Sequence, residues 1–218
     1  MDISSICQYQ PIKLTTERGE IDCRYYYDHT QHPTSVAVLY VTGVGGGWGT
    51  PAGGLYPKLC GSLVRIGIDG LRVRYRHPTD LSESVFDTLA GIAFLKEEHR
   101  IKSIGLVGHS FGGAVIIQAA IATPNIVTAI VTLATQSYGA SEAISKLNQR
   151  TSKLLIHGNE DKVLPFYCSQ QVYSRAHKPK QIVLYEGASH GLDEVSDEVY
   201  ELVYNWLVKN LRLTQHAP

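Results

Sequence analysis

The sequence predicts an α/β domain in which a mostly parallel β-sheet is covered by helices on both faces. Short apolar runs, typical of strands buried on both faces, alternate along the chain with longer segments of helical periodicity. Apolar residues make up 44% of the 218 residues, which is enough to build a sizeable core. Because no repeat, low-complexity tract or linker interrupts this alternation, we expect residues 1–218 to form a single domain.

The elements follow in order from these patterns. Residues 11–27 carry alternating apolar side chains around Glu17-Arg18-Gly19-Glu20, which predicts an N-terminal antiparallel hairpin. Residues 36–41 are a continuous apolar run that ends in a glycine-rich turn, the pattern of a strand inside a parallel sheet. Further strands are predicted over residues 71–75, 104–107, 126–133, 153–157 and 181–185. Helices are predicted over residues 56–67, from 81 onward after a capping box of Asp80 and Glu83, and over 114–123, 140–149, 165–175 and 193–210.

Composition excludes several classes of protein. The chain carries 20 basic and 20 acidic side chains, so its formal charge is zero and neither nucleic acid nor an anionic membrane is expected as its main partner. No apolar stretch is long enough to span a membrane, and the first residues lack the apolar run of a signal peptide. The four cysteines are far apart, and no metal-ligand spacing occurs. We therefore expect a cytoplasmic protein with free thiols, no cofactor and no metal ion.

A pentapeptide carries the clearest chemical signal. Gly108-His109-Ser110-Phe111-Gly112 matches the pattern Gly-x-Ser-x-Gly, and it stands directly between a predicted strand and a predicted helix. A turn this sharp presses the residues two positions before and two positions after the serine against neighbouring backbone, which explains a glycine at both 108 and 112. The context predicts that Ser110 projects from the turn as a nucleophile.

A base and an orienting acid follow in the order that such a serine requires. Asp161 comes soon after the strand predicted over 153–157, and His190 comes soon after the strand predicted over 181–185. The chain order is therefore Ser110, Asp161, His190, which differs from the orders of chymotrypsin and subtilisin. Glu160 is the adjacent alternative for the acid, and Asp161 is favoured because it begins an Asp-x-Val-x-Pro stretch.

These motifs resemble those of serine hydrolases of the α/β-hydrolase fold, and the resemblance covers nearly the whole chain. It implies Ser110 as nucleophile, Asp161 as acid and His190 as base. It also implies the amide of Phe111 as one oxyanion-hole donor and a second donor in the loop after residues 36–41. That loop has Thr42-Gly43 where a His-Gly pair is common in the family, so we expect the Val44 amide, or else that of Gly45, as the second donor.

Three other features allow more than one interpretation. The glycine-rich loop does not fit a dinucleotide-binding motif, because Trp48 and Thr50 occupy the positions where the last glycine would be needed. Trp48 is expected either to line an acyl pocket together with Gly45 or to pack against the next helix. Arg72, Arg74 and Arg76 alternate along one predicted strand and so are expected on one face, where they either form ion pairs or, through Arg76, attract an anionic substrate.

The space between strands indicates what kind of hydrolase this is. Only residues 136–152 separate the strands at 126–133 and 153–157, which is too short for a cap domain. The open site resembles that of small carboxylesterases and of dienelactone-hydrolase-like enzymes, although the latter typically carry cysteine in place of Ser110. We expect a monomer or homodimer that cleaves small-molecule esters through an acyl-serine. Thioesterase, amidase, peptidase and perhydrolase activities, or a non-catalytic binding module on the same scaffold, are the alternatives.

Overall fold

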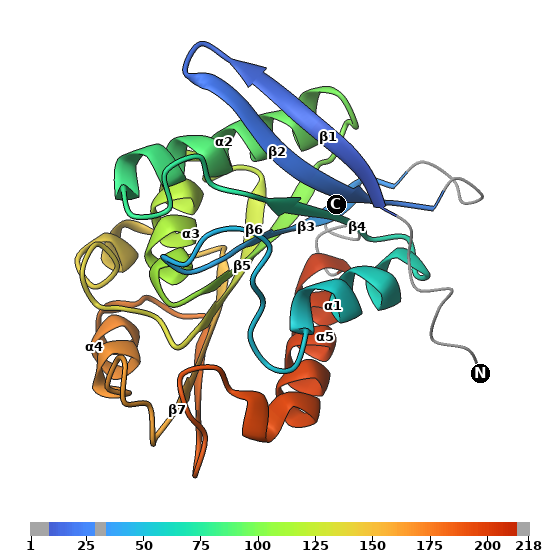
Figure 1. Cartoon of the computed structure of the whole chain (residues 1–218). Coiled ribbons are helices and arrows are strands. Elements are labelled where there is room, and N and C mark those ends of the chain that lie inside the picture. Colours follow the sequence, from blue (N-terminus) through green and yellow to red (C-terminus); the bar gives the residue numbers. More distant parts are fainter. Residues whose placement is uncertain (1–8, 29–33, 213–218) are drawn as a thin grey trace.

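The computed structural model describes residues 9–28 and 34–212, whose strands form one eight-stranded sheet (Figure 1). The strands are β1 (Tyr9–Thr16), β2 (Gly19–Tyr26), β3 (Val36–Val41), β4 (Asp69–Val73), β5 (Ser103–His109), β6 (Val127–Leu133), β7 (Ser152–Gly158) and β8 (Lys180–Tyr185). Their order is β1-β2-β4-β3-β5-β6-β7-β8. The pairs β1/β2 and β2/β4 are antiparallel and the other neighbours are parallel. The predicted sheet with its N-terminal hairpin is confirmed.

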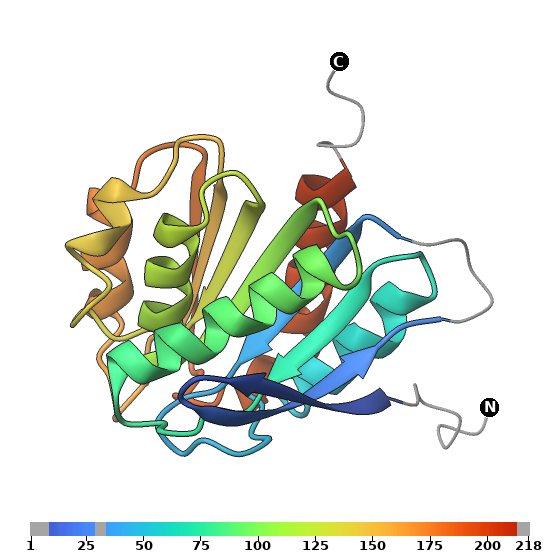
Figure 2. The same cartoon turned by 90° about the horizontal axis from the view of Figure 1, so that it is seen from above.

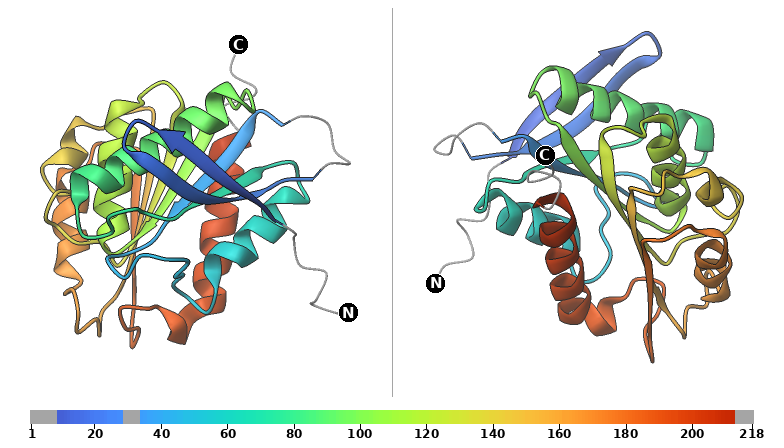
Figure 3. Two further views of the ribbon diagram at one scale, coloured as in Figure 1. Left: turned by 45° about the horizontal axis from the view of Figure 1, so that its top comes forward. Right: turned by 180° about the vertical axis from the view of Figure 1, so that it is seen from behind.

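The helices form a layer on each face of the sheet (Figures 2 and 3). They are α1 (Leu55–Val64), α2 (Leu81–Glu97), α3 (Phe111–Ala122), α4 (Tyr167–Arg175) and α5 (Ser196–Arg212), with short 3-10 turns η2 (Ala143–Lys146) and η3 (Asp193–Val195). Helices α2, α3 and α4 pack on one face and α1 and α5 on the other. In the described part of the chain no helix is both long enough and apolar enough to span a bilayer.

The central strands are apolar throughout because both of their faces are covered. All six residues of β3 are buried. Ala37 and Leu39 belong to the core beneath α2 and α3, whereas Val36 and Val38 belong to the core beneath α1 and α5. Each fully buried valine or leucine side chain of this strand contributes about 1.5–3 kcal/mol. A strand with strictly alternating apolar and polar residues would have supplied apolar side chains to only one of these two cores.

The predicted cap of α2 is formed in part. The carboxylate of Asp80 accepts a hydrogen bond of 3.0 Å from the backbone amide of Glu83, as an N-cap residue does. The side chain of Glu83 forms ion pairs instead, with Arg18 and Arg76 at 2.8 Å each. The acidic side of α2 therefore holds the tip of the β1–β2 hairpin and the segment after β4.

The helix predicted over residues 140–149 is wrong. Only the four-residue turn η2 forms there, and Leu147 already has an extended backbone with ψ 138°. Within η2 only Ile144 is buried, so the segment has no continuous apolar stripe to hold a longer helix against the sheet. The whole connection from β6 to β7 is thus short, and residues 9–28 and 34–212 include no cap domain over this edge of the sheet.

The expectation that three arginines share one face of a strand is also wrong. Strand β4 ends at Val73, so the period-two alternation does not extend to residue 76. Arg72 lies beneath the ring of Tyr56 in α1, while Arg76 binds Asp87 in α2 on the opposite side of the sheet. Arg74 is exposed and pairs with Asp22 at 3.3 Å.

One charged residue lies inside the fold without a carboxylate beside its amine. Lys153 in β7 is fully buried, and its Nζ donates hydrogen bonds to the carbonyls of Thr151 at 2.7 Å and Asn148 at 3.2 Å. Burial, together with the charge of Lys180, lowers the pKa of Lys153 from 10.5 to about 8. Because the folded pKa is the lower one, the fold favours the neutral amine, and charged Lys153 costs stability below pH 8.

Lys153→Met is therefore expected to be stabilised relative to the wild type most strongly at pH 8 and below. This relative gain is expected to shrink as the pH rises from 8 toward 10.5, because the lysine then becomes neutral in the unfolded chain as well. Urea unfolding at several pH values measures the difference, and the exposed Lys146→Met variant controls for the loss of one positive charge. A difference that did not change between pH 8 and 10 would contradict the assignment.

Candidate active site

Ser110 occupies the single residue between β5 and α3. Its backbone has φ 57° and ψ −119°, a conformation that costs a non-glycine residue about 1–3 kcal/mol. Two backbone hydrogen bonds hold it: the Ser110 amide donates to the Leu133 carbonyl at 2.8 Å, and the Ser110 carbonyl accepts from Gly113 at 3.0 Å. The sharp turn predicted from the pentapeptide is therefore present.

The flanking glycines are required by close backbone contacts. A Cβ atom added at Gly108 would lie 2.3 Å from the carbonyl oxygen of Gly112, and one added at Gly112 would lie 2.5 Å from that of Thr42. Both distances are far shorter than any real Cβ contact, and a backbone atom cannot rotate away. Strand β5, helix α3 and the end of β3 meet here with no space for a side chain.

Asp161 and His190 form a direct pair at the same edge of the sheet. Asp161 follows β7, His190 follows β8, and the distance from His190 Nδ1 to Asp161 Oδ2 is 2.6 Å. The other carboxylate oxygen, Oδ1, accepts the amides of Val163 and Leu164 at 2.8 Å each. Burial acts to raise the pKa of Asp161, but the hydrogen bonds that its oxygens accept outweigh burial, and the pKa is lowered.

Ser110 and His190 line one cavity of about 400 Å³. Val44 and Gly45 lie on its wall as expected, and the other lining residues are Thr42, Gly43, Gly46, Gly49, Thr50, Pro51, His109, Val163, Gly191 and Asp193. Val44 and Val163 are more than half exposed at this cavity. The side chains that bear charge or titrate there are His109, His190 and Asp193.

The two residues whose amides are expected to form an oxyanion hole lie next to Ser110 and in the loop after β3. Phe111 is the first residue of α3, so its N–H has no acceptor within the helix. Val44 is the second residue of a turn closed by a 3.0 Å hydrogen bond from the Gly46 amide to the Gly43 carbonyl. Gly43 lies so close to Ser110 that a Cβ atom added to it would be 3.3 Å from the Cβ of Ser110.

Two residues expected near the substrate lie elsewhere. Trp48 packs against Arg24, whose guanidinium carbon is 4.1 Å from the indole ring centre, and its carbonyl accepts Arg72 Nη2 at 2.5 Å. Arg76 donates to the buried carboxylate of Asp87 at 2.7 Å and to that of Glu83 at 2.8 Å. Among the described residues neither one lines the cavity at Ser110. The ion-pair interpretation of Arg76 fits these contacts, whereas the contacts of Trp48 are with arginines of β2 and β4 and not with the next helix as expected.

Several neighbours of the pair were not assigned a catalytic role by sequence, and of these only His109 and His157 are expected from it as structural neighbours of the site. His109 Nε2 donates to the carbonyl of His190 at 2.9 Å, and burial lowers the pKa of His109 to about 4. His157 and Ser169 form a hydrogen-bonded chain to Asp161. The His-Gly pair at the end of β7 is a weak sequence signal for the role of His157. The sequence around Ser169 on α4 and Asp193 in η3 carries no such signal.

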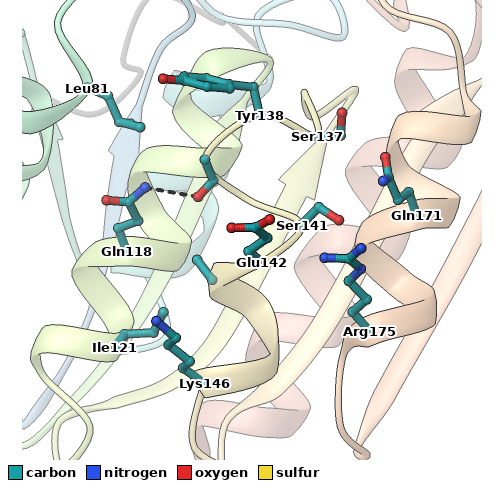
Figure 4. A pocket seen from close by; sticks show the side chains of 12 residues that line it. Leu81, Gln118, Ile121, Ser137, Tyr138, Ser141, Glu142, Lys146, Gln171 and Arg175 are labelled. Carbon is teal, nitrogen blue, oxygen red and sulfur yellow. Dashed lines mark hydrogen bonds between the residues drawn. The ribbon is translucent and has the colours of Figure 1, made fainter.

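A second, larger cavity of about 780 Å³ lies between α3, the segment around η2, and α4 (Figure 4). Gln118 on its wall donates to the Gly139 carbonyl at 2.9 Å, and Ser141 is a buried wall residue whose hydroxyl finds no partner. Its lining residues include no histidine and no cysteine. The buried Ser141 hydroxyl makes no hydrogen bond to Glu142 or Lys146 of the lining, so the smaller cavity at Ser110 is the better candidate for chemistry.

Comparison with known proteins agrees with this architecture. The sequence model described as "Dienelactone hydrolase family" matches residues 73–207. A dienelactone hydrolase from Anabaena variabilis has a similar structure, with TM-score 0.80, 17% identity, and coverage of 94% of this chain and 99% of the other. Est1E from Butyrivibrio proteoclasticus is similar with TM-score 0.79, 15% identity, and coverage of 93% and 99%. No curated protein matches the sequence. The α/β-hydrolase fold is thereby confirmed.

Gly108→Ala is expected to lower the free energy of unfolding by about 3 kcal/mol or more, because its methyl group meets backbone that cannot move aside. Gly45→Ala is the matched control, since a Cβ at Gly45 meets nothing within 4 Å, and a change within about 0.5 kcal/mol is expected there. Urea or thermal unfolding measures both. Equal stabilities of the two variants would show that the turn tolerates a side chain at 108.

Proposed function

The chain belongs to the dienelactone hydrolase family, and from that premise we propose that it is a serine hydrolase cleaving small, uncharged carboxylic esters through an acyl-serine intermediate. The observation that carries the proposal is the 2.6 Å contact of His190 with Asp161 beside a cavity that Ser110 also lines. A nucleophile, a base and an orienting acid are the groups that this reaction needs.

In the proposed first step, the Ser110 hydroxyl attacks the carbonyl carbon of the ester while His190 takes its proton. Asp161 accepts a hydrogen bond from the Nδ1–H group of His190, which leaves the Nε2 lone pair available as the base. The protonated imidazole then gives its proton to the departing alcohol. In the second step His190 activates a water molecule, and hydrolysis of the acyl-serine returns the free enzyme.

The amides of Phe111 and Val44 are proposed to bind the oxyanion of both tetrahedral intermediates. Such donors are fixed before the reaction begins, so they stabilise the developing charge without reorganising. Loss of one donor in comparable sites lowers turnover by about 10²–10³. Only substitution by proline removes a backbone N–H, and the conformation of the 42–51 loop decides where the Val44 N–H points.

The charge of the lining supports an uncharged substrate. Asp193 is an exposed acidic residue at the cavity, and Arg76, the cation expected from the sequence to attract an anion, is bound to Asp87 and Glu83 elsewhere. A substrate that carries a carboxylate near the ester would meet Asp193 with no compensating lysine or arginine in the lining. The modest volume of about 400 Å³ and the absence of a cap over the described sheet support short acyl groups.

Ser110→Ala is expected to abolish both ester hydrolysis and labelling by a fluorophosphonate, because only an activated serine hydroxyl reacts with that probe. The fold should be retained, since a methyl group fits the space of a hydroxymethyl group; circular dichroism and thermal unfolding verify it. Labelling of the variant at the wild-type rate would mean that another residue is the nucleophile. Absence of labelling in the wild type would favour the non-catalytic alternative.

Catalytic efficiency on p-nitrophenyl esters is expected to peak at short acyl chains. A fully walled pocket gains about 0.8 kcal/mol per buried methylene, and without a cap this gain should end early. A short ester with a terminal carboxylate is expected to react about tenfold more slowly than its neutral analogue, and Asp193→Asn should narrow that difference. Efficiency that rose steadily to long chains, or a preference for the anionic ester, would contradict this substrate class. Thioester and amide analogues in the same panel test the other acyl-transfer activities.

A further inference from the structure

The carboxylate of Asp161 accepts more hydrogen bonds than the pair with His190 requires. Oδ1 accepts two backbone amides. Oδ2 accepts His190 Nδ1 at 2.6 Å and also contacts Nε2 of a second histidine, His157, at 3.0 Å. A carboxylate offers about four acceptor positions, so both oxygens are fully used. His157 stands four residues earlier, near the end of β7, and none of its side chain is exposed.

The partners of His157 fix where its proton lies. Nε2 is 3.0 Å from both Asp161 Oδ2 and the Leu164 carbonyl oxygen. A carboxylate and a carbonyl only accept hydrogen bonds, so Nε2 must carry the proton. Burial lowers the pKa of His157, which keeps the ring neutral and leaves Nδ1 as an acceptor.

A hydroxyl from another element completes the chain. Ser169 on α4 is fully buried, and its Oγ lies 2.7 Å from His157 Nδ1. Because that nitrogen is the acceptor, the Ser169 hydroxyl donates to it. The Ser169 hydroxyl thus donates to Nδ1 of His157, and Nε2–H of His157 donates to Oδ2 of Asp161. The same Oδ2 also accepts Nδ1–H of His190.

We propose that His157, locked in one tautomer by Ser169, is a positioning residue that holds the Asp161 carboxylate for His190. The inference rests on the proposed function and extends it to α4. A shared Oδ2 cannot rotate away from His190 without losing the bond to His157. Its electron density is also divided between two donors, so the proton of the short hydrogen bond stays on the His190 side. A histidine that only filled space would need neither the Ser169 hydroxyl nor this tautomer.

The test begins with fluorophosphonate labelling of the wild-type protein. A wild type that does not react refutes the proposed function, and with it the role of His157 in that reaction. In a reactive protein, Ser169→Ala removes only the hydroxyl that locks His157. We expect kcat for a short p-nitrophenyl ester to fall about tenfold with KM within twofold. We also expect the far-downfield proton resonance of the His190–Asp161 hydrogen bond to shift or broaden. Ser169→Thr, which keeps the hydroxyl, should restore both.

Ser174→Ala is the matched control, because this serine is exposed on the same helix and donates only to the Gln171 carbonyl. It is expected to match the wild type. His157→Gln keeps an N–H near the position of Nε2 and should retain more activity than His157→Leu, which has none. If Ser169→Ala keeps the wild-type kcat and resonance, the proposal is overturned. It is equally overturned if kcat falls only in proportion to lost folded protein while the resonance stays unchanged.

Discussion

The passage of the backbone from β5 into α3 is the constraint on which the rest of the site depends. Gly108 and Gly112 are in close contact with neighbouring backbone atoms. The amide of the strained Ser110 between them donates a hydrogen bond to the Leu133 carbonyl at the end of β6. The contact of Gly112 with Thr42 links the same turn to the end of β3. The ends of three neighbouring strands are therefore held together. These contacts keep Ser110 in a strained backbone conformation that an isolated turn would not adopt.

The glycine-rich loop from 42 to 51 is held in place by hydrogen bonds to other parts of the fold. Below it, the buried guanidinium of Arg72 binds the carbonyls of Trp48 and Gly49. Just beyond its end, the Ala52 amide donates to the Gly191 carbonyl and the Gly53 amide to the Asp193 carboxylate, both at 2.7 Å. The end of the loop expected to bear one oxyanion donor is thus hydrogen-bonded to the segment that bears His190.

The sequence was most informative where chemistry and backbone geometry demand particular residue types. The glycines around Ser110 and the apolar runs of the central strands predicted the turn and the sheet, because few other residues satisfy those packing constraints. Asp161 could be chosen over Glu160 from the stretch that follows it, and the observed contact to His190 agrees. The segment at 140–149 misled because its helical spacing carries too few apolar residues to anchor a helix.

Roles that arise only from tertiary contacts could not be predicted. The partners of Arg76 are residues whose proximity depends on how α2 crosses the sheet, and the early end of β4 separates Arg76 from Arg72. Ser169 is one of the two serines on the polar helix α4, and nothing in its neighbours along the chain marks it as facing His157. Asp193 reaches the cavity only because η3 turns back toward the 42–51 loop. Such positions become visible once the elements are assembled.

The short connection between β6 and β7 has a consequence for how this scaffold can diversify. It rises to an exposed tip at Tyr138, which is 80% accessible, on the edge of the sheet that also carries Ser110. Chain inserted at such a tip leaves the strand pairings and both cores intact, and loop length adds only slowly to the entropic cost of closure. Evolution or protein engineering can therefore insert a cap at this tip. The cap would change which molecules reach the site, while the residues of the site stay the same.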